Sequence, residues 1–359
     1  MKNVLIITPG FLPLLGGMEE QVYLLGKEMV NAGNTVTVLT EKTKPTFPSR
    51  ENYDGINVKR VNIIFCRKFS LPLIFFSYVN HLIKNKYDLI IVRTFTLPAL
   101  VTGFLKRVGL LKTKTVVTAE TGGVNDDIEL ISKRLFSNLI YYVIKGNDFF
   151  NCICDDNYRH LIKHKFPKEK ITRIYNGINL SPFINSYYPK KINNYLFLGQ
   201  LRKEKGIWEL IKAFEDKKIT NNLYIGGDGP EKPLIIKYIS KNNLKNKIFI
   251  LGRISKEEKA DFFSKGEALI LPSYSEGFPL VILEAISRKK IIITTDVSDI
   301  RKIFGDNVYY CAKKDPESIR KIINKLSKND FKQPNYDIIK EVADIKSVSL
   351  QFLSIIYKS

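Results

Sequence analysis

The stretch LILPSYSEGFPLVILEA, residues 269–285, decides the fold of this chain. The apolar residues 268–271 predict a buried parallel strand that ends at Pro272, and a short loop, residues 273–279, precedes a helix that begins at Leu280. In an open α/β sheet, ligands bind just outside the carboxyl ends of the strands. The backbone N–H groups at the start of a helix also favour phosphate. We therefore expect this loop to border a ligand site.

Two carboxylates stand in this stretch: Glu276 in the loop and Glu284 eight positions later in the helix. The neighbours of Glu284 are apolar on nearly every side, and a helix of that kind is normally buried. A buried carboxylate is costly unless a partner hydrogen-bonds it. Two interpretations stay open: Glu284 binds a ligand, or it pairs with a nearby Lys or Arg or reaches a gap that faces solvent.

The pair Glu276 and Glu284, in the setting SEGFPLVILEA, resembles the double-glutamate motif of retaining GT-B glycosyltransferases of family 4. The resemblance implies an α/β fold in which two Rossmann-like domains face each other across a cleft. It also implies transfer of a sugar from a nucleotide diphosphate sugar without a required metal or other cofactor. In that family the first Glu and the backbone after it contact the donor sugar, and the second Glu holds the ribose hydroxyls. The implied donor-binding residues are Glu276, Gly277, Phe278, Pro279, Leu280 and Glu284.

The loop GQLRKEKG, residues 199–206, follows a predicted strand and opens a predicted helix at residues 207–214. Lys205 therefore stands near a positive helix end, which is unfavourable unless an anion binds there; the alternative is a solvated lysine. In the family, Arg and Lys of a G-R-x-x-x-x-K-G pattern hold the donor phosphates. Lys205 matches, but Gln200 stands in place of the Arg, so Arg202 is the candidate replacement.

By the same resemblance, Lys205 and Glu276 are the catalytic residues, although Glu276 orients the sugar rather than acting as a base. Arg253, after a predicted strand at residues 247–251, matches the residues that border the nucleotide base. The family commonly has a glycine pair where Ser298 and Asp299 stand, which leaves the role of that loop open.

The first half opens with a strand (residues 4–8), a helix (18–31) and a strand (35–40), which is the βαβ start of a doubly wound sheet. Gly16 and Gly17 at the helix entrance permit close backbone approach to a ligand, and the resemblance puts them near the donor phosphates and the acceptor. Glu120 follows a strand predicted at residues 115–119. It stands where the family carries a His that contacts the donor sugar, and it either accepts a sugar hydroxyl or has a structural role.

The resemblance covers nearly the whole chain and predicts its division. Residues 1–183 are expected to form the acceptor-binding domain, 184–194 the linker and 195–335 the nucleotide-sugar-binding domain. A terminal helix within residues 336–359 is expected to cross back to the first domain.

The net charge of +21 over 359 residues is shared between both halves, which argues against a basic nucleic-acid arm and favours an anionic surface as a partner. Residues 67–86, 97–114 and 130–145 are basic, apolar and aromatic together. They are either ordinary amphipathic helices that cover a sheet or helices that lie in a membrane interface. We expect a cytoplasmic protein, peripheral at the inner face of the cytoplasmic membrane. Its expected acceptor is a lipid-linked saccharide or glycolipid of polysaccharide, capsule or lipopolysaccharide biosynthesis, and its expected interfacial aromatics are Phe75, Phe76, Tyr78, Tyr141 and Tyr142.

The four cysteines, Cys66, Cys152, Cys154 and Cys311, predict buried, reduced thiols rather than a disulfide framework. With three histidines in the chain and no Asp-x-Asp at a strand end, no metal site is expected. The first strand begins almost at Met1, so no signal peptide is expected. The longest uncharged run, residues 69–83, is too short and too broken by proline for a spanning helix.

Two other classes of function remain as alternatives. A nucleotide-binding oxidoreductase would need G-x-G-x-x-G after the first strand, where this chain has PGFLPLLGG, although Glu41 follows the second strand. A nucleic-acid binder is motivated by charge alone, because no recognised module supports it.

Overall fold

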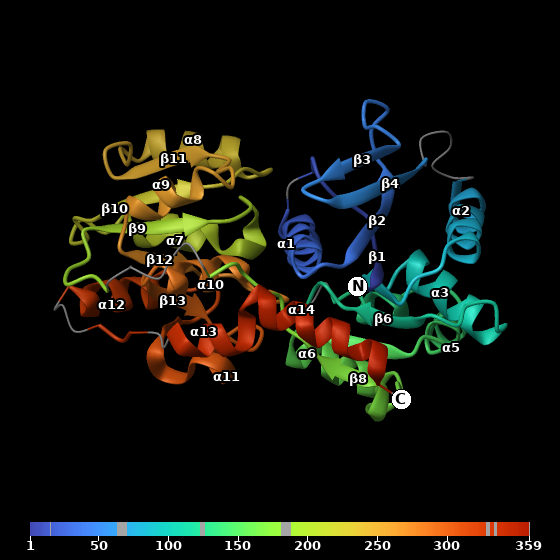
Figure 1. Cartoon of the computed structure of the whole chain (residues 1–359). Helices are drawn as coiled ribbons and strands as arrows, with labels where there is room; N and C mark the ends of the chain where they lie inside the picture. Colours follow the sequence, from blue (N-terminus) through green and yellow to red (C-terminus); the bar gives the residue numbers. More distant parts are fainter. Residues whose placement is uncertain are drawn as a thin grey trace. The chain divides into compact units, whose positions relative to one another are not determined.

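A computed structural model describes residues 1–14, 16–62, 70–122, 126–180, 188–327, 331–333 and 336–358. The chain divides into two compact units, Met1–Asn179 with Val342–Ser359, and Leu180–Glu341. Each unit is a largely parallel sheet covered by helices (Figure 1), which confirms the expected α/β class with two Rossmann-like units. None of the helices in the described residues has the length and apolarity to cross a bilayer.

The sheet of the first unit has eight strands in the order β3-β4-β2-β1-β5-β6-β7-β8. All neighbouring strands are parallel except the hairpin of β3 and β4. β2, β4 and β3 lie on one side of β1 and β5 to β8 lie on the other, so the strand order reverses between β1 and β5. The strands are β1 (Asn3–Thr8), β2 (Thr35–Lys42), β3 (Arg50–Tyr53), β4 (Ile56–Asn62), β5 (Leu89–Arg93), β6 (Lys114–Thr118), β7 (Phe149–Cys152) and β8 (Ile171–Arg173).

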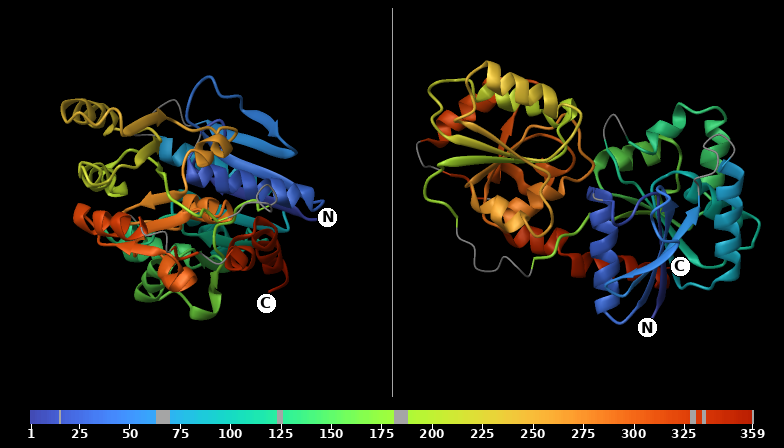
Figure 2. Two further views of the ribbon diagram at one scale, coloured as in Figure 1. Left: turned by 90° about the vertical axis from the view of Figure 1, so that its left-hand side faces the viewer. Right: turned by 90° about the horizontal axis from the view of Figure 1, so that it is seen from above.

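Alternate residues of these strands face two separate cores, because successive side chains of a strand point to opposite faces. Val4 and Ile6 pack with α1 (Gly17–Asn31) and α14 (Ile345–Ser354). Leu5 and Ile7 pack on the other face, whose cover includes α2 (Ser70–Lys84), α3 (Leu97–Arg107), α5 (Ser137–Ile144) and α6 (Asp155–Lys163). The right-hand view of Figure 2 shows α1 and α2 on opposite sides of this sheet.

The C-terminal residues form two helices rather than one continuous helix. α13 (Tyr336–Ala343) ends before Asp344, whose side chain accepts a hydrogen bond from the backbone N–H of Lys346 and so caps α14. The interruption is held by Ile178: its N–H donates to the Ala343 carbonyl at 2.8 Å, and its own carbonyl accepts from Ile345 at 3.0 Å. α14 then buries Ile345, Val348 and Phe352 in the core of the first unit, next to α1.

The second unit contains six parallel strands in the order β11-β10-β9-β12-β13-β14. The predicted strand and helix of the stretch 269–285 are confirmed as β12 (Ala268–Leu271) and α10 (Leu280–Ser287). The order reverses between β9 and β12. The other elements are β9 (Asn194–Leu198), α7 (Ile207–Ala213), β10 (Asn222–Gly226), α8 (Lys232–Lys241), β11 (Ile248–Gly252), α9 (Lys259–Ser264), β13 (Ile291–Thr295), α11 (Ile300–Phe304), β14 (Tyr309–Cys311) and α12 (Pro316–Leu326).

The expectation of interfacial aromatics is wrong for two residues. Tyr78 is 0% exposed and Tyr141 is 4% exposed, because both lie on the inner faces of their helices. Phe76 and Tyr142 are exposed, and Phe75 is half-buried against the core. Each of these helices therefore covers the sheet with one face, as the alternative interpretation expects, and also presents apolar side chains outward.

Several expectations fall on residues outside the described ones. They are Cys66, residues 67–69 of the first basic segment, and residues 184–187 of the linker. The other three cysteines, Cys152, Cys154 and Cys311, are buried thiols, as expected.

Candidate active site

The two loops predicted to hold the ligand meet at the switch point of the second sheet, between β9 and β12. The backbone N–H of Tyr274 donates to the Glu204 carbonyl at 2.8 Å. Gly206 has φ +68, and a Cβ at this position would lie 2.1 Å from the Pro272 carbonyl oxygen. Glycine is therefore required for the loops to approach this closely, and the crevice at a switch point is where such sheets bind ligands.

Lys205 and Glu276 form an ion pair across these loops. Lys205 Nζ lies 2.6 Å from Oε1 and 2.8 Å from Oε2 of Glu276. The side chains are 26% and 10% exposed, so the pair is partly shielded from water but remains reachable. A cation and a carboxylate are thus held together where the resemblance places the donor phosphates and the donor sugar.

Glu284 is buried in α10, with its residue 8% exposed. Its Oε1 lies 2.7 Å from Nζ of Lys259, which α9 brings to the same place. The sequence left open whether Glu284 pairs with a nearby Lys or Arg, and the structure shows that it pairs with a lysine. The pair does not exclude binding, because both side chains keep partial exposure, 15% for Lys259 and 11% for Glu284.

The loop before α10 is braced from the opposite side. Ser298 has φ +56, a conformation that glycine favours, and its hydroxyl donates to the Gly277 carbonyl. Thr295 donates to the Ser273 carbonyl in the same way. Phe278 is 6% exposed and anchors the loop in the core. The loop that carries Glu276 is therefore preorganised.

The two candidate arginines are exposed at the same edge of the sheet. Arg202 precedes a short 3-10 turn, Lys203–Lys205, and within residues 188–327 no hydrogen bond or ion pair is formed by its guanidinium. Arg253 follows β11, near Asp228. The pKa of Asp228 is lowered first by its hydrogen bond with Lys232 and to a smaller extent by the charges of Lys232 and Arg253.

In the first unit, Gly16 and Gly17 differ in what they permit. A Cβ on Gly16 would lie 2.4 Å from a carboxylate oxygen of Glu19, whereas one on Gly17 would meet nothing within 4 Å. The Glu19 carboxylate folds back over the start of α1 and lies against Gly16, and as the end of a flexible side chain it can move aside. Gly17 is open, so close approach of a ligand remains possible there.

Glu120 is not a freely available acceptor. Its carboxylate forms an ion pair with Arg93, whose Nη2 donates to Glu120 Oε2 at 2.8 Å and to Asn176 Oδ1 at 3.1 Å. Glu120 and Arg93 side chains are 5% and 2% exposed. Burial raises the pKa of Glu120, and the Arg93 charge acts in the opposite direction.

Sequence reasoning missed three residues at this edge: Arg93, Asn176 and Asp127. Asp127 accepts a hydrogen bond from the Phe95 N–H at 3.0 Å, and burial together with the nearby Asp126 and Glu120 raises its pKa to about 7. The one available signal was Arg93, a charged residue that ends the apolar strand LIIVR. Lys259 was also missed, because its link to Glu284 depends on packing of separate helices.

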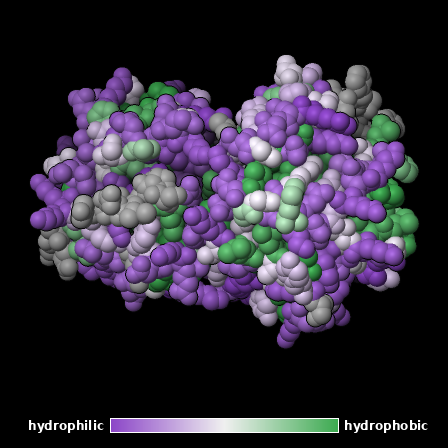
Figure 3. All heavy atoms as spheres, viewed as in Figure 1, coloured by the Kyte–Doolittle hydropathy of each residue, from purple (hydrophilic) through white to green (hydrophobic). Residues whose placement is uncertain are grey.

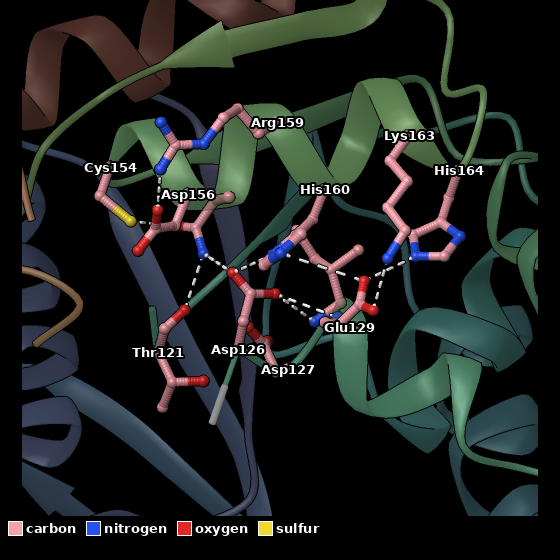
Figure 4. Close-up of polar contacts among 12 residues, drawn as sticks. Thr121, Asp126, Asp127, Glu129, Cys154, Asp156, Arg159, His160, Lys163 and His164 are labelled. Atoms are coloured by element: carbon pink, nitrogen blue, oxygen red, sulfur yellow. Dashed lines mark hydrogen bonds and ion pairs between the residues drawn. The ribbon is translucent and has the colours of Figure 1, made fainter. Parts of the chain in front are cut away.

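A second polar cluster joins α6 to the short helix α4 (Glu129–Ser132), as Figure 4 shows. Lys163 and His164 lie 2.7 Å and 3.0 Å from the Glu129 carboxylate, and their hydrogen bonds lower its pKa to about 2. His160 contacts the buried Asp126 at 3.0 Å. Among the described residues no group of three or more His, Cys, Asp or Glu is arranged to hold a metal ion.

Two family models match the chain. Residues 15–182 match the model for Glycosyltransferase Family 4, and residues 185–343 match the model for glycosyl transferases group 1. An uncharacterised glycosyltransferase of Methanocaldococcus jannaschii is 32% identical over 52% of this chain and 54% of its own length. TuaC of Bacillus subtilis, named for teichuronic acid biosynthesis, is 29% identical over 38% of this chain and 33% of its own length. The match thus spans about half or less of these relatives.

Solved structures match the whole chain in fold. A sucrose-phosphate synthase from Thermosynechococcus elongatus aligns with a TM-score of 0.79 at 18% identity, covering 99% of this chain and 98% of the other. HepE of Anabaena, solved in complex with UDP and glucose, aligns with a TM-score of 0.75 at 16% identity over the full length of both chains. At these identities the likeness shows the fold alone.

Proposed function

Because this chain belongs to glycosyltransferase family 4, we propose that it transfers a sugar from a nucleotide diphosphate sugar to an acceptor, with retention of the anomeric configuration. The observation that carries the proposal is the Lys205–Glu276 ion pair at the switch point of the second unit. It supplies a cation for phosphate and a carboxylate for sugar hydroxyls within one partly shielded site.

The contacts of this ion pair can be exchanged for contacts with a bound donor. An incoming diphosphate competes for the Lys205 ammonium, and the Glu276 carboxylate that it releases can accept a hydroxyl of the donor sugar. Gly277, Phe278, Pro279 and Leu280 would line the sugar through the backbone, and Glu284 would accept the ribose hydroxyls. Arg202 and Arg253 are proposed to contact the phosphates and the base.

We propose that no metal takes part. Charge on the departing diphosphate would be stabilised by Lys205 and Arg202, which act most strongly where negative charge develops. The acceptor would attack from the side that the diphosphate leaves, and a phosphate oxygen would take the acceptor's proton. No side chain then has to serve as the base.

In this scheme the second unit binds the nucleotide sugar and the first unit binds the acceptor, with Gly16, Gly17 and Glu120 at its ligand edge. The proposed acceptor is a lipid-linked saccharide or glycolipid at the inner face of the cytoplasmic membrane. Support comes from the net charge of +21 and from the name of the Bacillus relative, which assigns that protein to teichuronic acid biosynthesis.

A thermal-shift screen across nucleotide sugars, with NAD and RNA as competing ligand classes, tests the proposal. One or a few nucleotide sugars should raise the melting temperature, and donor hydrolysis or transfer should follow with that donor. Lys205→Ala should lower turnover about 10²- to 10³-fold, while Lys203→Ala, which changes an exposed lysine in the same turn, should retain it. Stabilisation by NAD with hydride transfer, or salt-dependent RNA binding without donor binding, would instead support one of the alternatives.

A further inference from the structure

We propose that one end of the first unit, formed by α2, α3 and the segment from α4 to α5, is a docking surface for an anionic lipid bilayer. This inference deepens the proposed function and rests on it for the nature of the acceptor. The surface itself is argued from exposure, packing and charge, so it can be tested without knowing either substrate.

Large apolar side chains are unusually exposed on this end of the unit. Scattered exposed apolar residues are ordinary, but a contiguous patch of them marks an interaction site. Figure 3 shows apolar residues gathered along the right-hand edge of the view, over these helices. The most exposed are Leu73 (69%), Phe76 (65%), Leu135 (79%), Phe136 (70%), Leu139 (60%) and Tyr142 (57%).

The three elements form one continuous, firmly packed surface. Phe75 of α2 contacts Phe104 of α3, with ring centroids 6.0 Å apart. α3 and α5 approach through Gly103, where an added Cβ would lie 2.3 Å from the Val143 carbonyl. Arg107 of α3 covers the Tyr142 ring at 3.7 Å and donates to its carbonyl. α2, α3 and α5, which carry exposed apolar side chains, are therefore packed against one another.

The α4–α5 segment is held to the body of the unit from its inner side. Glu129 is bound by Lys163 at the end of α6 and by His164, which follows it (Figure 4). Tyr141 stacks on His164 with ring centroids 4.3 Å apart. Glu129, the one acidic residue within 129–144, is therefore paired within the protein. The outer side of the segment carries only apolar, neutral and basic side chains.

The charge of the surface selects its occupant. Residues 70–84, 97–112 and 130–145 contain no Asp or Glu, and among their basic residues Lys84, Arg107, Lys112, Lys133 and Arg134 are exposed. Apolar side chains surrounded by lysine and arginine match the acyl boundary and the headgroups of an anionic bilayer. A second copy of the chain would bring equal positive charges together, which disfavours self-association.

Flotation with vesicles tests the proposal. Wild-type protein should bind vesicles of phosphatidylglycerol and phosphatidylcholine at low salt, bind them less at high salt, and bind pure phosphatidylcholine weakly. Replacing Lys133 and Arg134 by Gln should weaken partition about fivefold per residue, equivalent to about 1 kcal/mol each. The matched control replaces Lys217 and Lys218, exposed lysines of the second unit.

A second pair of variants tests how much the apolar side chains contribute to vesicle binding. Leu135→Ser, Phe136→Ser and Leu139→Ser together should reduce binding roughly tenfold or more, even at high salt. Leu234→Ser with Ile236→Ser on α8, which are 57% and 50% exposed, should change nothing. All five side chains replaced in these two variants are exposed and can be changed without opening the core, so circular dichroism and melting temperature should stay constant.

A fluorescent reporter locates the contact. The chain has a single Trp, so Phe136→Trp in a Trp208→Phe background gives one emitting residue. Its emission should shift to the blue and be quenched by brominated lipid on anionic vesicles, whereas Ile236→Trp in the same background should not respond.

The proposal is overturned if wild-type protein stays unbound at low salt, or if the apolar and charge variants bind as wild type does. It is also overturned if light scattering shows a dimer that the apolar variant dissociates. Nucleotide-sugar binding by the same preparations is measured in parallel: retained donor binding with no vesicle binding rejects the surface alone, and vesicle binding without donor binding rejects the proposed function alone.

Discussion

Lys205 Nζ lies within 2.8 Å of both carboxylate oxygens of Glu276, although the two residues are 71 positions apart. The contact joins the loop after β9 to the loop after β12, which are the two loops on either side of the strand-order reversal. A phosphate that binds there therefore competes with a carboxylate for the lysine.

The first prediction concerns this pair. Lys205→Ala should lower turnover about 10²- to 10³-fold, because the lost cation acts most strongly on charge that develops in the transition state. Donor affinity should fall by less, since the variant also removes the competing ion pair. Steady-state transfer and calorimetric donor binding separate the two effects, with Lys203→Ala as control. Unchanged turnover would contradict the proposal that the donor diphosphate binds at this loop.

The second prediction concerns Glu284. Glu284→Gln should weaken nucleotide binding by about 1–2 kcal/mol, because a charge-assisted hydrogen bond to the ribose becomes a neutral one. The variant also leaves Lys259 without its partner carboxylate, so it should lower the melting temperature. Adding Lys259→Gln should restore stability but not affinity. Recovery of affinity in the double variant would show that Glu284 acts only by pairing with Lys259.

The third prediction is metal independence. Donor hydrolysis and transfer should survive excess EDTA, because cations in the proposed site come from lysine and arginine side chains. Assays before and after chelation, followed by addition of Mg²⁺ or Mn²⁺, provide the measurement. Activity that disappears with EDTA and returns with either ion would contradict the proposed mechanism.

The fourth prediction is a pH dependence of stability from His81. Burial, and then the charge of Lys59, lower its pKa to about 4. The folded state therefore favours the neutral ring, and stability is full above the unfolded pKa of about 6.5 and is lost as pH falls from there towards 4. The loss should reach up to about 3 kcal/mol.

Urea unfolding of wild type and His81→Gln between pH 7 and 4 isolates this contribution. The raised pKa of Asp127 acts in the opposite sense, since stability from its proton is lost as pH rises through about 7, and it is present in both proteins. The variant should show the shallower loss on acidification. Parallel curves would mean that His81 does not titrate as described.

The sequence predicted what depends on near neighbours in the chain. β12 and α10 follow from an apolar run, a proline and a second apolar run, and both begin where expected. Their loop carries Glu276, so this part of the candidate site could also be placed.

What could not be predicted depends on segments that are distant in sequence. The Arg93–Glu120 and Lys259–Glu284 pairs lie 27 and 25 positions apart and require the packing of whole elements. Tyr78 and Tyr141 lie in segments whose composition is typical of helices at a membrane interface. The orientation of each helix on the sheet nevertheless buries them. The break at Asp344 depends on Ile178, which no local pattern at the C-terminus reveals.

The return of α14 to the first unit has a consequence for biosynthesis. Ile345, Val348, Phe352 and Ile355 belong to the core that α1 and β1 begin, so the second unit is an insertion between the parts of the first. Residues 1–179 leave the ribosome long before these four residues are synthesised. During translation the first-made sheet therefore has one incompletely covered face, and the inserted unit, contiguous in the chain, can close its core first. A nascent chain stalled before Ile345 should accordingly be more open to proteolysis and chaperone binding in its first half than in its second.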